Sequence, residues 1–268
     1  MLPTVTQSGS LISKITVAVN STDSHARLQS EFCDPVSPVT FLLRQNLEAV
    51  QSADAVVLAF PPNNLHYALD ATGMKQALQQ KHVISLLART PRHEIEDVLR
   101  IGETGLGVTT NLKLVRAMPT IGAAIHESAT LLTDAQSSAA KETVELAAWM
   151  FGCLGRVFRI TDECMDAATG VSALANALTT VAINHIVQIA VANGVAREDV
   201  VGVVAQCVRG TASMLLSDIE VGQLQDSLSS PGSITEQAIS QLERGLPKVL
   251  EVAASVAIAR ATNYEKRR

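Results

Sequence analysis

Few polar side chains in this sequence stand in an arrangement that could carry acid–base or nucleophilic chemistry. His126 stands beside Glu127, and this pair is either a catalytic dyad or a polar pair at the start of a helix. No serine, histidine and aspartate, and no cysteine and histidine, have the spacing expected of a catalytic triad or dyad. The residue types and spacings alone therefore assign no catalytic residue.

Metal and thiol chemistry are not indicated either. The four cysteines, Cys33, Cys153, Cys164 and Cys207, are scattered and form no C-x-x-C pair. No cysteine and histidine have the spacing of zinc ligands, so we expect no metal site. Scattered thiols are typical of a reducing compartment. Met1–Ser10 lacks the charged segment and apolar core of a secretory signal, and we therefore expect a cytoplasmic protein.

Composition limits the partners of the chain. Its 268 residues carry a net charge of −5, and aromatic residues make up only 3%. Nucleic-acid binding needs a basic face and often stacking aromatic rings, so we expect no nucleic-acid partner. The longest apolar helical segment, Val171–Val191, is interrupted by Asn176, Asn184, His185 and Gln188. We therefore expect no segment that spans a membrane.

The first half of the chain alternates short apolar runs with helical segments. Short runs rich in β-branched residues are typical of strands that helices cover on both faces. The predicted strands are Ile15–Val19, Ala55–Phe60, Val83–Leu87 and Leu112–Ala117, and the predicted helices are His25–Phe32, Leu65–Gln80 and Pro91–Ile101. This alternation predicts an α/β domain with a doubly wound parallel sheet over residues 1–130.

Long helical patterns replace the strands after residue 130, apart from a candidate strand at Val157–Ile160. The predicted helices are Ala135–Leu154, Asp162–Ala192, Arg197–Ser217, Gln223–Ser227 and Thr235–Arg260. The segment Asp162–Ala192 is apolar on nearly all sides, and such a helix must be buried all round. A small domain rarely buries one alone. We therefore predict an all-α domain over residues 131–268 that a second subunit covers in a homodimer, with a higher oligomer left open.

Several stretches of the second half carry a specific resemblance. They are RAMP at 116–119, ESAT at 127–130, FGCLGRV at 151–157, MDAAT at 165–169, AQCVRGTA at 205–212, SPGSIT at 230–235 and LERG at 242–245. In order and spacing these stretches resemble the R-x-M-P-N-T-x-A, E-x-x-T, F-x-x-x-G-x-V, M-D-A-x-T, A-x-Q-T-x-x-G-A, S-P-G-G-T-T and L-E-x-G motifs of pyrroline-5-carboxylate reductases. The resemblance extends from about Ile15 to Ala259 and is stronger after Val115.

This resemblance implies a Rossmann-like domain followed by a helical dimerisation domain, with NADP(H) as the cofactor. It implies hydride transfer from NADPH to the C=N carbon of a cyclic imine, 1-pyrroline-5-carboxylate, which gives proline.

The glycine-rich loop with which family members begin has no counterpart here. Such a loop holds the cofactor pyrophosphate against a helix N-terminus. Only one glycine, Gly9, precedes the first predicted strand, whereas a strand, turn and helix need roughly 25 to 30 residues. Gly9 is interpreted as part of a flexible tail rather than of a phosphate site. We therefore predict an incomplete Rossmann-like domain in which binding of NADP(H) is weakened.

The ribose end of the implied cofactor site falls on Asn20, Ser21 and Thr22. In the family, NADP-binding members meet the ribose 2′-phosphate at this position. The sequence has no acidic residue at these three positions, which is compatible with NADP. A helix N-cap would explain Ser21 and Thr22 equally well.

Two further cofactor segments are implied by the resemblance. Ala59, Pro61 and Asn63 lie in the family's A-x-K-P-x segment, where Pro61 replaces the lysine. Ala88 and Arg89 replace the Ala-Gly pair beside the nicotinamide. Arg89 then either recruits an anionic ligand or fills space left by an absent cofactor.

The implied substrate-binding residues are Thr120, Ser172, Asn176, Ser230 and Thr235. Around them the family motifs are altered. Ile121 and Ile234 replace threonines, and SALANA at 172–177 replaces the family's S-G-S-G-P-A turn, which predicts an ordinary helix there. We therefore expect a pocket that is more apolar than that of the family.

Three functional hypotheses remain open. The first is the family activity, NADPH-dependent reduction of 1-pyrroline-5-carboxylate to proline, in a weakened or altered form. The second is a non-redox enzyme that reuses the dimeric fold for a larger apolar substrate. The third is a non-catalytic paralogue that is retained for its dimer interface. Binding of NADPH separates the first hypothesis from the other two.

Overall fold

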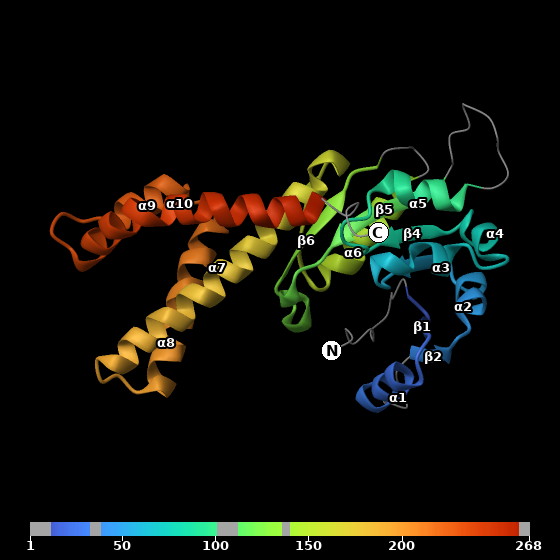
Figure 1. The fold of residues 1–268 in the computed structure, drawn as a ribbon, viewed down its shortest axis with the longest axis horizontal. Helices are drawn as coiled ribbons and strands as arrows, with labels where there is room; N and C mark the ends of the chain where they lie inside the picture. Colours follow the sequence, from blue (N-terminus) through green and yellow to red (C-terminus); the bar gives the residue numbers. More distant parts are fainter. Residues whose placement is uncertain (1–11, 33–38, 101–111, 136–139, 263–268) are drawn as a thin grey trace. The chain divides into compact units, whose positions relative to one another are not determined.

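The computed structural model describes residues 12–32, 39–100, 112–135 and 140–262. The chain divides into two compact units (Figure 1), of which the first comprises residues 1–169 and 261–268 and the second comprises residues 170–260.

The first unit is built on strands that are mostly parallel. They are β1 (Ile15–Val19), β2 (Val39–Leu43), β3 (Ala55–Leu58), β4 (His82–Ser85), β5 (Lys113–Met118), β6 (Ser128–Thr133) and β7 (Gly155–Ile160). One sheet has the order β1-β2, and the other has the order β3-β4-β5-β6-β7. All neighbouring strands are parallel except β5 and β6, which are antiparallel. The predicted α/β class with a parallel sheet is therefore confirmed.

Helices surround these strands. They are α1 (Thr22–Glu31), α2 (Asn46–Ser52), η1 (Pro62–Asn64), α3 (Leu65–Leu69), α4 (Met74–Leu78), α5 (Arg92–Leu99), η2 (Ile121–Ile125), α6 (Lys141–Gly152) and η4 (Asp162–Cys164). Successive residues of β4 enter different cores, since Val83 packs in one buried cluster with Leu78 and Ile95, and Ile84 packs in another with Val144. Leu114 and Val115 of β5 divide between the two clusters in the same way. Because both faces of β4 and β5 are covered, the central residues of both strands are apolar on either side.

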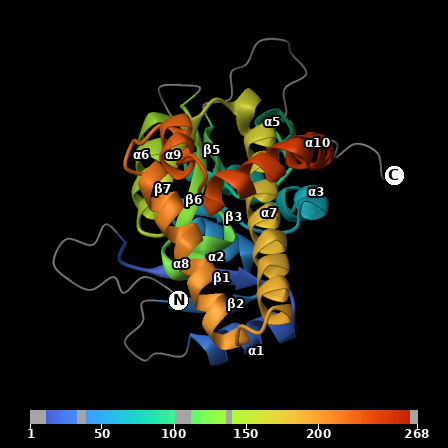
Figure 2. The same cartoon turned by 90° about the vertical axis from the view of Figure 1, so that its left-hand side faces the viewer.

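The sheet of the first unit is split. Within the described residues, no hydrogen-bonded ladder joins β1 to β3, so β1 pairs only with β2 and β3 pairs only with β4. Figure 2 shows β1 and β2 side by side. We call residues 15–52, which hold β1, α1, β2 and α2, the β1–β2 ribbon. Among the described residues, this split agrees with the incomplete Rossmann-like arrangement that the sequence predicts.

The division between the units differs from the boundary predicted after residue 130. β6 pairs with β5, and β7 pairs with β6, so the sheet continues to Ile160 and the first unit ends at Thr169. The candidate strand Val157–Ile160 is the end of β7. β2 and β6 were not predicted.

The second unit is helical, as predicted. It contains most of α7 (Met165–Ala192), followed by α8 (Arg197–Leu215), α9 (Val221–Leu228) and most of α10 (Ile234–Thr262). α7 and α10 approach closely at Gly170, where an added Cβ would lie 2.9 Å from the Cα of Ile258. The SALANA stretch at 172–177 lies inside α7, which confirms the predicted helix.

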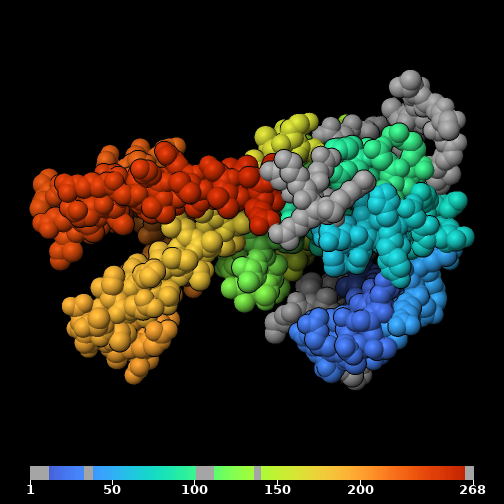
Figure 3. All heavy atoms as spheres, viewed as in Figure 1, coloured from blue at the N-terminus to red at the C-terminus, as the bar shows by residue number. Residues whose placement is uncertain are grey.

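The apolar surface of α7 is largely uncovered in a single chain. Residues Asp162–Ala192 are long and apolar enough to cross a membrane, and only 6% of their most apolar window is buried. The expectation that no segment has this length and composition is therefore wrong. In the space-filling view, α7 and α10 are open along much of the visible face (Figure 3). Val181, Ile186 and Ile189 are among the exposed side chains.

Candidate functional site

The predicted cofactor and substrate positions of the first unit follow the carboxyl ends of parallel strands. Ala59 follows β3, Ala88 and Arg89 come shortly after β4, and Thr120 comes shortly after β5. The β3–β4 ladder continues past the strand ends, since the Leu86 amide donates to the Leu58 carbonyl at 2.9 Å. Ligands of doubly wound sheets bind outside this edge.

Arg89 has left-handed backbone geometry, with φ of 59°. Side chains rarely adopt this geometry, whereas glycine adopts it without cost. The glycine that the family carries here therefore matches a backbone requirement that this chain still has. Ala88 is half-buried, and its carbonyl accepts a hydrogen bond from the Thr90 hydroxyl at 3.3 Å.

The segment after β3 is open to solvent. Ala59, Pro61 and Asn63 are all exposed. Pro61 precedes η1, and its carbonyl accepts from the Asn64 amide at 2.8 Å. A proline at this position supplies neither the charge nor the amide that the family's lysine would supply.

At the ribose end, Ser21 is the N-cap of α1, and its hydroxyl accepts from the Ser24 amide at 3.1 Å. The N-cap interpretation of Ser21 is therefore confirmed. Asn20 is exposed, and its side-chain oxygen accepts a hydrogen bond from the side-chain nitrogen Nδ2 of Asn46 at 3.1 Å. Thr22 is the first residue of α1.

The amide and the hydroxyl of Thr120 both form hydrogen bonds within the protein. Its amide donates to the Ser128 hydroxyl at 3.1 Å, and its own hydroxyl accepts from the Ala129 amide at 3.0 Å. The side chain therefore ties η2 to β6. Next to it, Ile121 and Ile125 are 84% and 72% exposed, so the surface beside Thr120 is apolar.

Arg116 is a functional candidate that sequence reasoning missed. It lies on β5 with only 2% of its side chain exposed, and it bonds Asp162 at 3.2 Å and Asp166 at 2.8 Å. Its Nε has no partner in the described part of the chain. The Arg116 amide also donates to the Thr133 hydroxyl at 2.9 Å. Arg116 therefore fixes the start of α7 against the carboxyl end of β5, although about fifty residues separate the partners in sequence.

The four substrate positions of the second unit form two separate pairs. Ser172 and Asn176 are one helical turn apart on α7, close to the Gly170–Ile258 contact with α10. Thr235 is exposed near the other end of α10, about 34 Å along the helix axis from Ile258 at 1.5 Å per residue. Ser230 is exposed just before that helix. A single chain therefore does not bring the two pairs together.

His126 and Glu127 form neither a catalytic dyad nor the start of a helix. His126 has φ of 61°, and its Nδ1 lies 2.8 Å from the Cys153 carbonyl. The Glu127 amide donates to the Gly122 carbonyl at 2.9 Å. The pair belongs to the turn between η2 and β6. Across the described residues, no group of three His, Cys, Asp or Glu side chains is placed to bind a metal.

These features define a class of protein. An open, mostly parallel sheet with candidate residues at its carboxyl edge is the arrangement of doubly wound dinucleotide-binding folds, and in this chain long apolar helices follow it. Residues 162–264 match the family model described as pyrroline-5-carboxylate reductase dimerisation. Residues 1–89 match the model described as NADP oxidoreductase, coenzyme F420-dependent.

Individual relatives narrow the class. Delta-1-pyrroline-5-carboxylate reductase of Curvularia clavata is 30% identical over 244 residues, which cover 90% of this chain and 76% of the relative. Pyrroline-5-carboxylate reductase of Neurospora crassa is 30% identical over 242 residues, covering 85% of this chain and 73% of the relative. The chain belongs to the pyrroline-5-carboxylate reductase family.

Solved structures share the fold. A pyrroline-5-carboxylate reductase from Coxiella burnetii superposes with a TM-score of 0.73 and 25% identity, covering 93% of this chain and 97% of that one. A Plasmodium falciparum pyrroline carboxylate reductase with NADP bound gives 0.74 at 21% identity, covering 95% and 98%.

Proposed function

We propose that this protein reduces a cyclic imine of the 1-pyrroline-5-carboxylate type with NADPH, with weaker cofactor binding than its relatives have. The observation that supports this most is the carboxyl edge of β3, β4 and β5, where the segments around Ala59, Arg89 and Thr120 lie at the ends of neighbouring parallel strands or just beyond them. NADPH would supply the hydride for the C=N carbon, and the imine nitrogen would take up a proton.

The described residues fit the two ends of NADPH unequally. The ribose end has polar groups at Asn20 and Ser21, and no acidic side chain at positions 20–22 repels a phosphate. The pyrophosphate would need backbone amides on a strand between β1 and β3, and the described residues place none there. Pro61 adds no charge to compensate. The proposed weak binding rests on the lack of such a strand among the described residues, and no catalytic step is assigned to a residue of this chain.

We further propose that the working molecule is a homodimer in which a partner completes the substrate site. Thr235 near the start of α10, and Ser230 just before this helix, lie too far from the Gly170–Ile258 contact to reach Ser172 and Asn176 of the same chain. A second copy that covers α7 would also bury Val181, Ile186 and Ile189, at roughly 25 cal/mol for each Å² of apolar surface. The family model matched by residues 162–264 carries dimerisation in its description, which supports this proposal.

Two measurements test the reductase proposal. Titration of the 268-residue chain with NADPH, followed by nicotinamide fluorescence, should give a dissociation constant roughly tenfold or more above that of the Coxiella burnetii relative measured in parallel. Proline formation from 1-pyrroline-5-carboxylate should be slow but should depend on NADPH. If the chain neither binds NADPH nor forms proline when NADPH is in large excess, the proposal is contradicted. Tight NADPH binding would contradict the argument from the missing pyrophosphate grip.

One observation favours a second candidate function, a reaction on a larger apolar substrate. Ile121 and Ile125 expose apolar side chains directly after Thr120, whose hydroxyl is bound to β6. A substrate with an apolar substituent would cover this surface. In that case kcat/KM for a bulky apolar imine should exceed kcat/KM for 1-pyrroline-5-carboxylate. The substitution Ile121→Thr should reduce the difference between these two kcat/KM values. An apolar ligand that raises the melting temperature while NADPH does not would instead support a non-redox function.

A further inference from the structure

Arg89 carries a charge that is rare at the carboxyl edge of β3, β4 and β5. The three segments that follow these strands, residues 59–64, 86–91 and 119–127, contain no other arginine or lysine. Because β4 lies between β3 and β5 in the sheet, Arg89 belongs to the middle segment of the three. Arg89 is half-buried, and a charge that is partly shielded from water forms stronger pairs than a fully exposed one.

Two other arginines close to these strands serve the fold itself. Arg92, the first residue of α5, donates from Nε to a carboxylate oxygen of Glu96 at 2.7 Å and from Nη1 to the Leu114 carbonyl at 2.6 Å. Arg116 on β5 is buried and pairs with two aspartates. The side chains of Arg92 and Arg116 are therefore committed to the protein, and Arg89 is the arginine to consider for binding a ligand.

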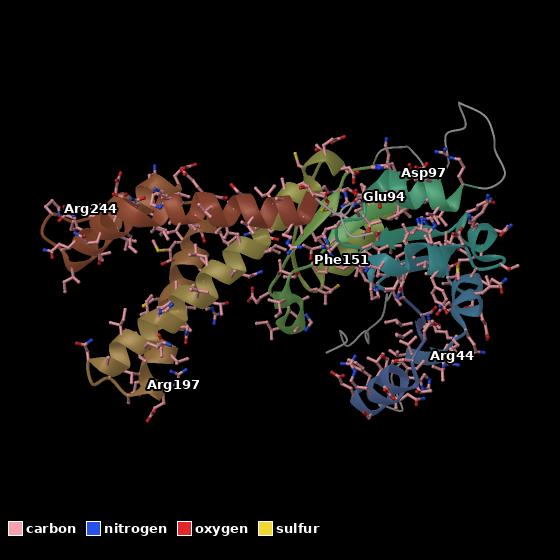
Figure 4. All side chains as sticks on the ribbon, in the orientation of Figure 1. Arg44, Glu94, Asp97, Phe151, Arg197 and Arg244 are labelled. Carbon is pink, nitrogen blue, oxygen red and sulfur yellow. The ribbon has the colours of Figure 1, made fainter. Side chains whose placement is uncertain are left out.

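The acidic residues nearest to Arg89 in sequence lie on α5, where Figure 4 labels Glu94 and Asp97. Asp97 pairs with Arg100, directly after this helix, at 3.1 Å. Glu94 is in the first turn, where the positive end of the helix dipole stabilises a carboxylate. A guanidinium has five N–H donors, so contacts of Arg89 with the protein are compatible with a further pair of hydrogen bonds to a ligand.

The substrate type of the proposed function has a carboxylate on its ring, and this anion needs a binding group. None of the five candidate substrate positions carries a positive charge. Residues 172–177 lie inside α7, whose amides donate along the helix, and the Thr120 amide donates to the Ser128 hydroxyl. A guanidinium suits a carboxylate, to which it donates through two parallel N–H groups. Arg89 therefore supplies what the candidate substrate positions lack.

We propose that Arg89 binds the carboxylate of the substrate and makes this protein select an anionic cyclic imine over a neutral one. Of the two roles that the sequence leaves open for Arg89, this is the recruitment of an anionic ligand. The inference rests on the proposed function and adds the residue that recognises the anion. It is specific to this chain, because the family motif has a glycine at this position, which offers no side chain to a substrate.

The test uses ligands that cannot be reduced, so that the result does not depend on NADPH. Calorimetry on the full chain compares cyclopentanecarboxylate with cyclopentanemethanol, which has the same ring and no charge. The wild type should bind the carboxylate roughly tenfold more tightly, and Arg89→Met should reduce this preference to about twofold or less. Arg100→Met, which removes an exposed positive charge directly after α5, should keep the full preference.

Two further variants guard against a change in fold. Arg89 has φ of 59°, so Arg89→Gly removes the charge at a position where glycine is favoured, and it should show the same loss of preference. Arg89→Lys keeps the charge but not the two parallel donors, so its preference should be intermediate. A wild type that binds both ligands equally, as it would if Glu94 neutralised Arg89, overturns the inference. An Arg89→Met variant that keeps the tenfold preference also overturns it.

Turnover then separates this inference from the proposed function. A carboxylate preference that depends on Arg89, in a chain that reduces no imine, would refute the proposed function and leave the carboxylate site standing. Reduction of 1-pyrroline-5-carboxylate with the same KM in the wild type and in Arg89→Met would support the proposed function and refute the inference. If both proposals hold, Arg89→Met should raise this KM roughly tenfold.

Discussion

Gly155 allows β6 and β7 to approach closely because it has no side chain. It begins β7 with φ of 143°, and an added Cβ would lie 2.3 Å from the amide nitrogen and the carbonyl oxygen of Ser128 on β6. Both contacts are with backbone, which cannot move without breaking the β6–β7 ladder. Gly155→Ala should therefore lower the free energy of unfolding by about 3 kcal/mol, as measured by urea denaturation.

Gly152 is the matched control for this substitution. It ends α6, and an added Cβ would meet no atom within 4 Å. Gly152→Ala should leave the unfolding free energy unchanged or raise it by up to about 1 kcal/mol. Equal effects of the two substitutions would contradict the steric argument.

The buried ion pairs of Arg116 allow a second comparison between residues. Arg116→Met would leave Asp162 and Asp166 without their cation, and we expect a loss of about 3 to 5 kcal/mol in unfolding free energy. Arg159 forms a similar pair with Glu145, but both side chains are well exposed. Arg159→Met should therefore cost less than about 1 kcal/mol. Similar losses of unfolding free energy in the two variants would show that burial does not strengthen the ion pairs of Arg116.

A substitution at Arg89 can distinguish the effect of backbone strain from the effect on cofactor binding. Its left-handed φ predicts that Arg89→Gly relieves strain, which should raise the unfolding free energy by about 1 kcal/mol, less whatever the side-chain contacts of Arg89 contribute. The same change should not bring NADPH affinity to the level of the Coxiella burnetii relative, because we attribute the proposed weak binding to the pyrophosphate end of the cofactor site and not to Arg89. Full recovery of NADPH binding in this variant would place the defect at Arg89 alone.

At the scale of elements, His82 joins a strand to a helix. It lies on β4, and its Nδ1 is 2.8 Å from the hydroxyl of Thr143 on α6. Partial burial, assisted by the charge of Lys113, lowers the pKa of His82 below its ordinary value of 6.5. The unfolded chain therefore takes up a proton at His82 more readily than the folded chain does.

The sign of the pH dependence follows. This contribution to stability is fully present above pH 6.5 and is lost as pH falls through the lower pKa of the folded state. Between pH 7 and pH 5 the wild type should lose more stability than His82→Gln, as measured by urea unfolding at each pH. Parallel profiles for the two proteins would exclude His82 as a source of the acid sensitivity.

Sequence patterns predicted most of the apolar strands but missed β2, which is also apolar, and β6, which is rich in hydroxyl side chains. Ile15–Val19 is β1 as predicted, because nothing but apolar and β-branched residues occurs there. β6 was missed because Ser128, Thr130 and Thr133 read as loop residues. In the structure all three are buried, and their hydroxyls bond one another or the backbone of Arg116. Only the folded chain supplies those partners.

The candidate site divides in the same way. Segments at strand ends, such as those around Ala59 and Arg89, could be placed by alignment with a known family. Arg116 could not, because it acts through contacts with residues that are distant in sequence. The separation of Ser172 from Thr235 could not be predicted either, since sequence motifs carry no information on the distance between them in space.

At the scale of the whole molecule, the exposed apolar face of α7 predicts that a second copy of the chain packs against it. Ile189, which is 64% exposed, should lie in the contact between two copies. Light scattering should find a dimer at micromolar concentration, and Ile189→Glu should shift it toward monomer or unfold it. Tyr67→Glu, which changes an exposed aromatic residue of α3 in the first unit, should leave the dimer intact. A folded wild-type monomer under these conditions would defeat the dimer proposal.

The split sheet has a consequence for local opening. Two strands alone are marginally stable in water, and α1, which packs beside them, contains no buried residue. Amide hydrogens of β1 and β2 should therefore exchange with deuterium much faster than those of β4, which opens only with the core. NADPH bound at Asn20 and Ser21, as proposed, would require β1 and β2 to be paired, so part of its binding free energy would go into keeping the two strands together. NADPH should therefore slow deuterium exchange in β1 and leave exchange in β4 unchanged.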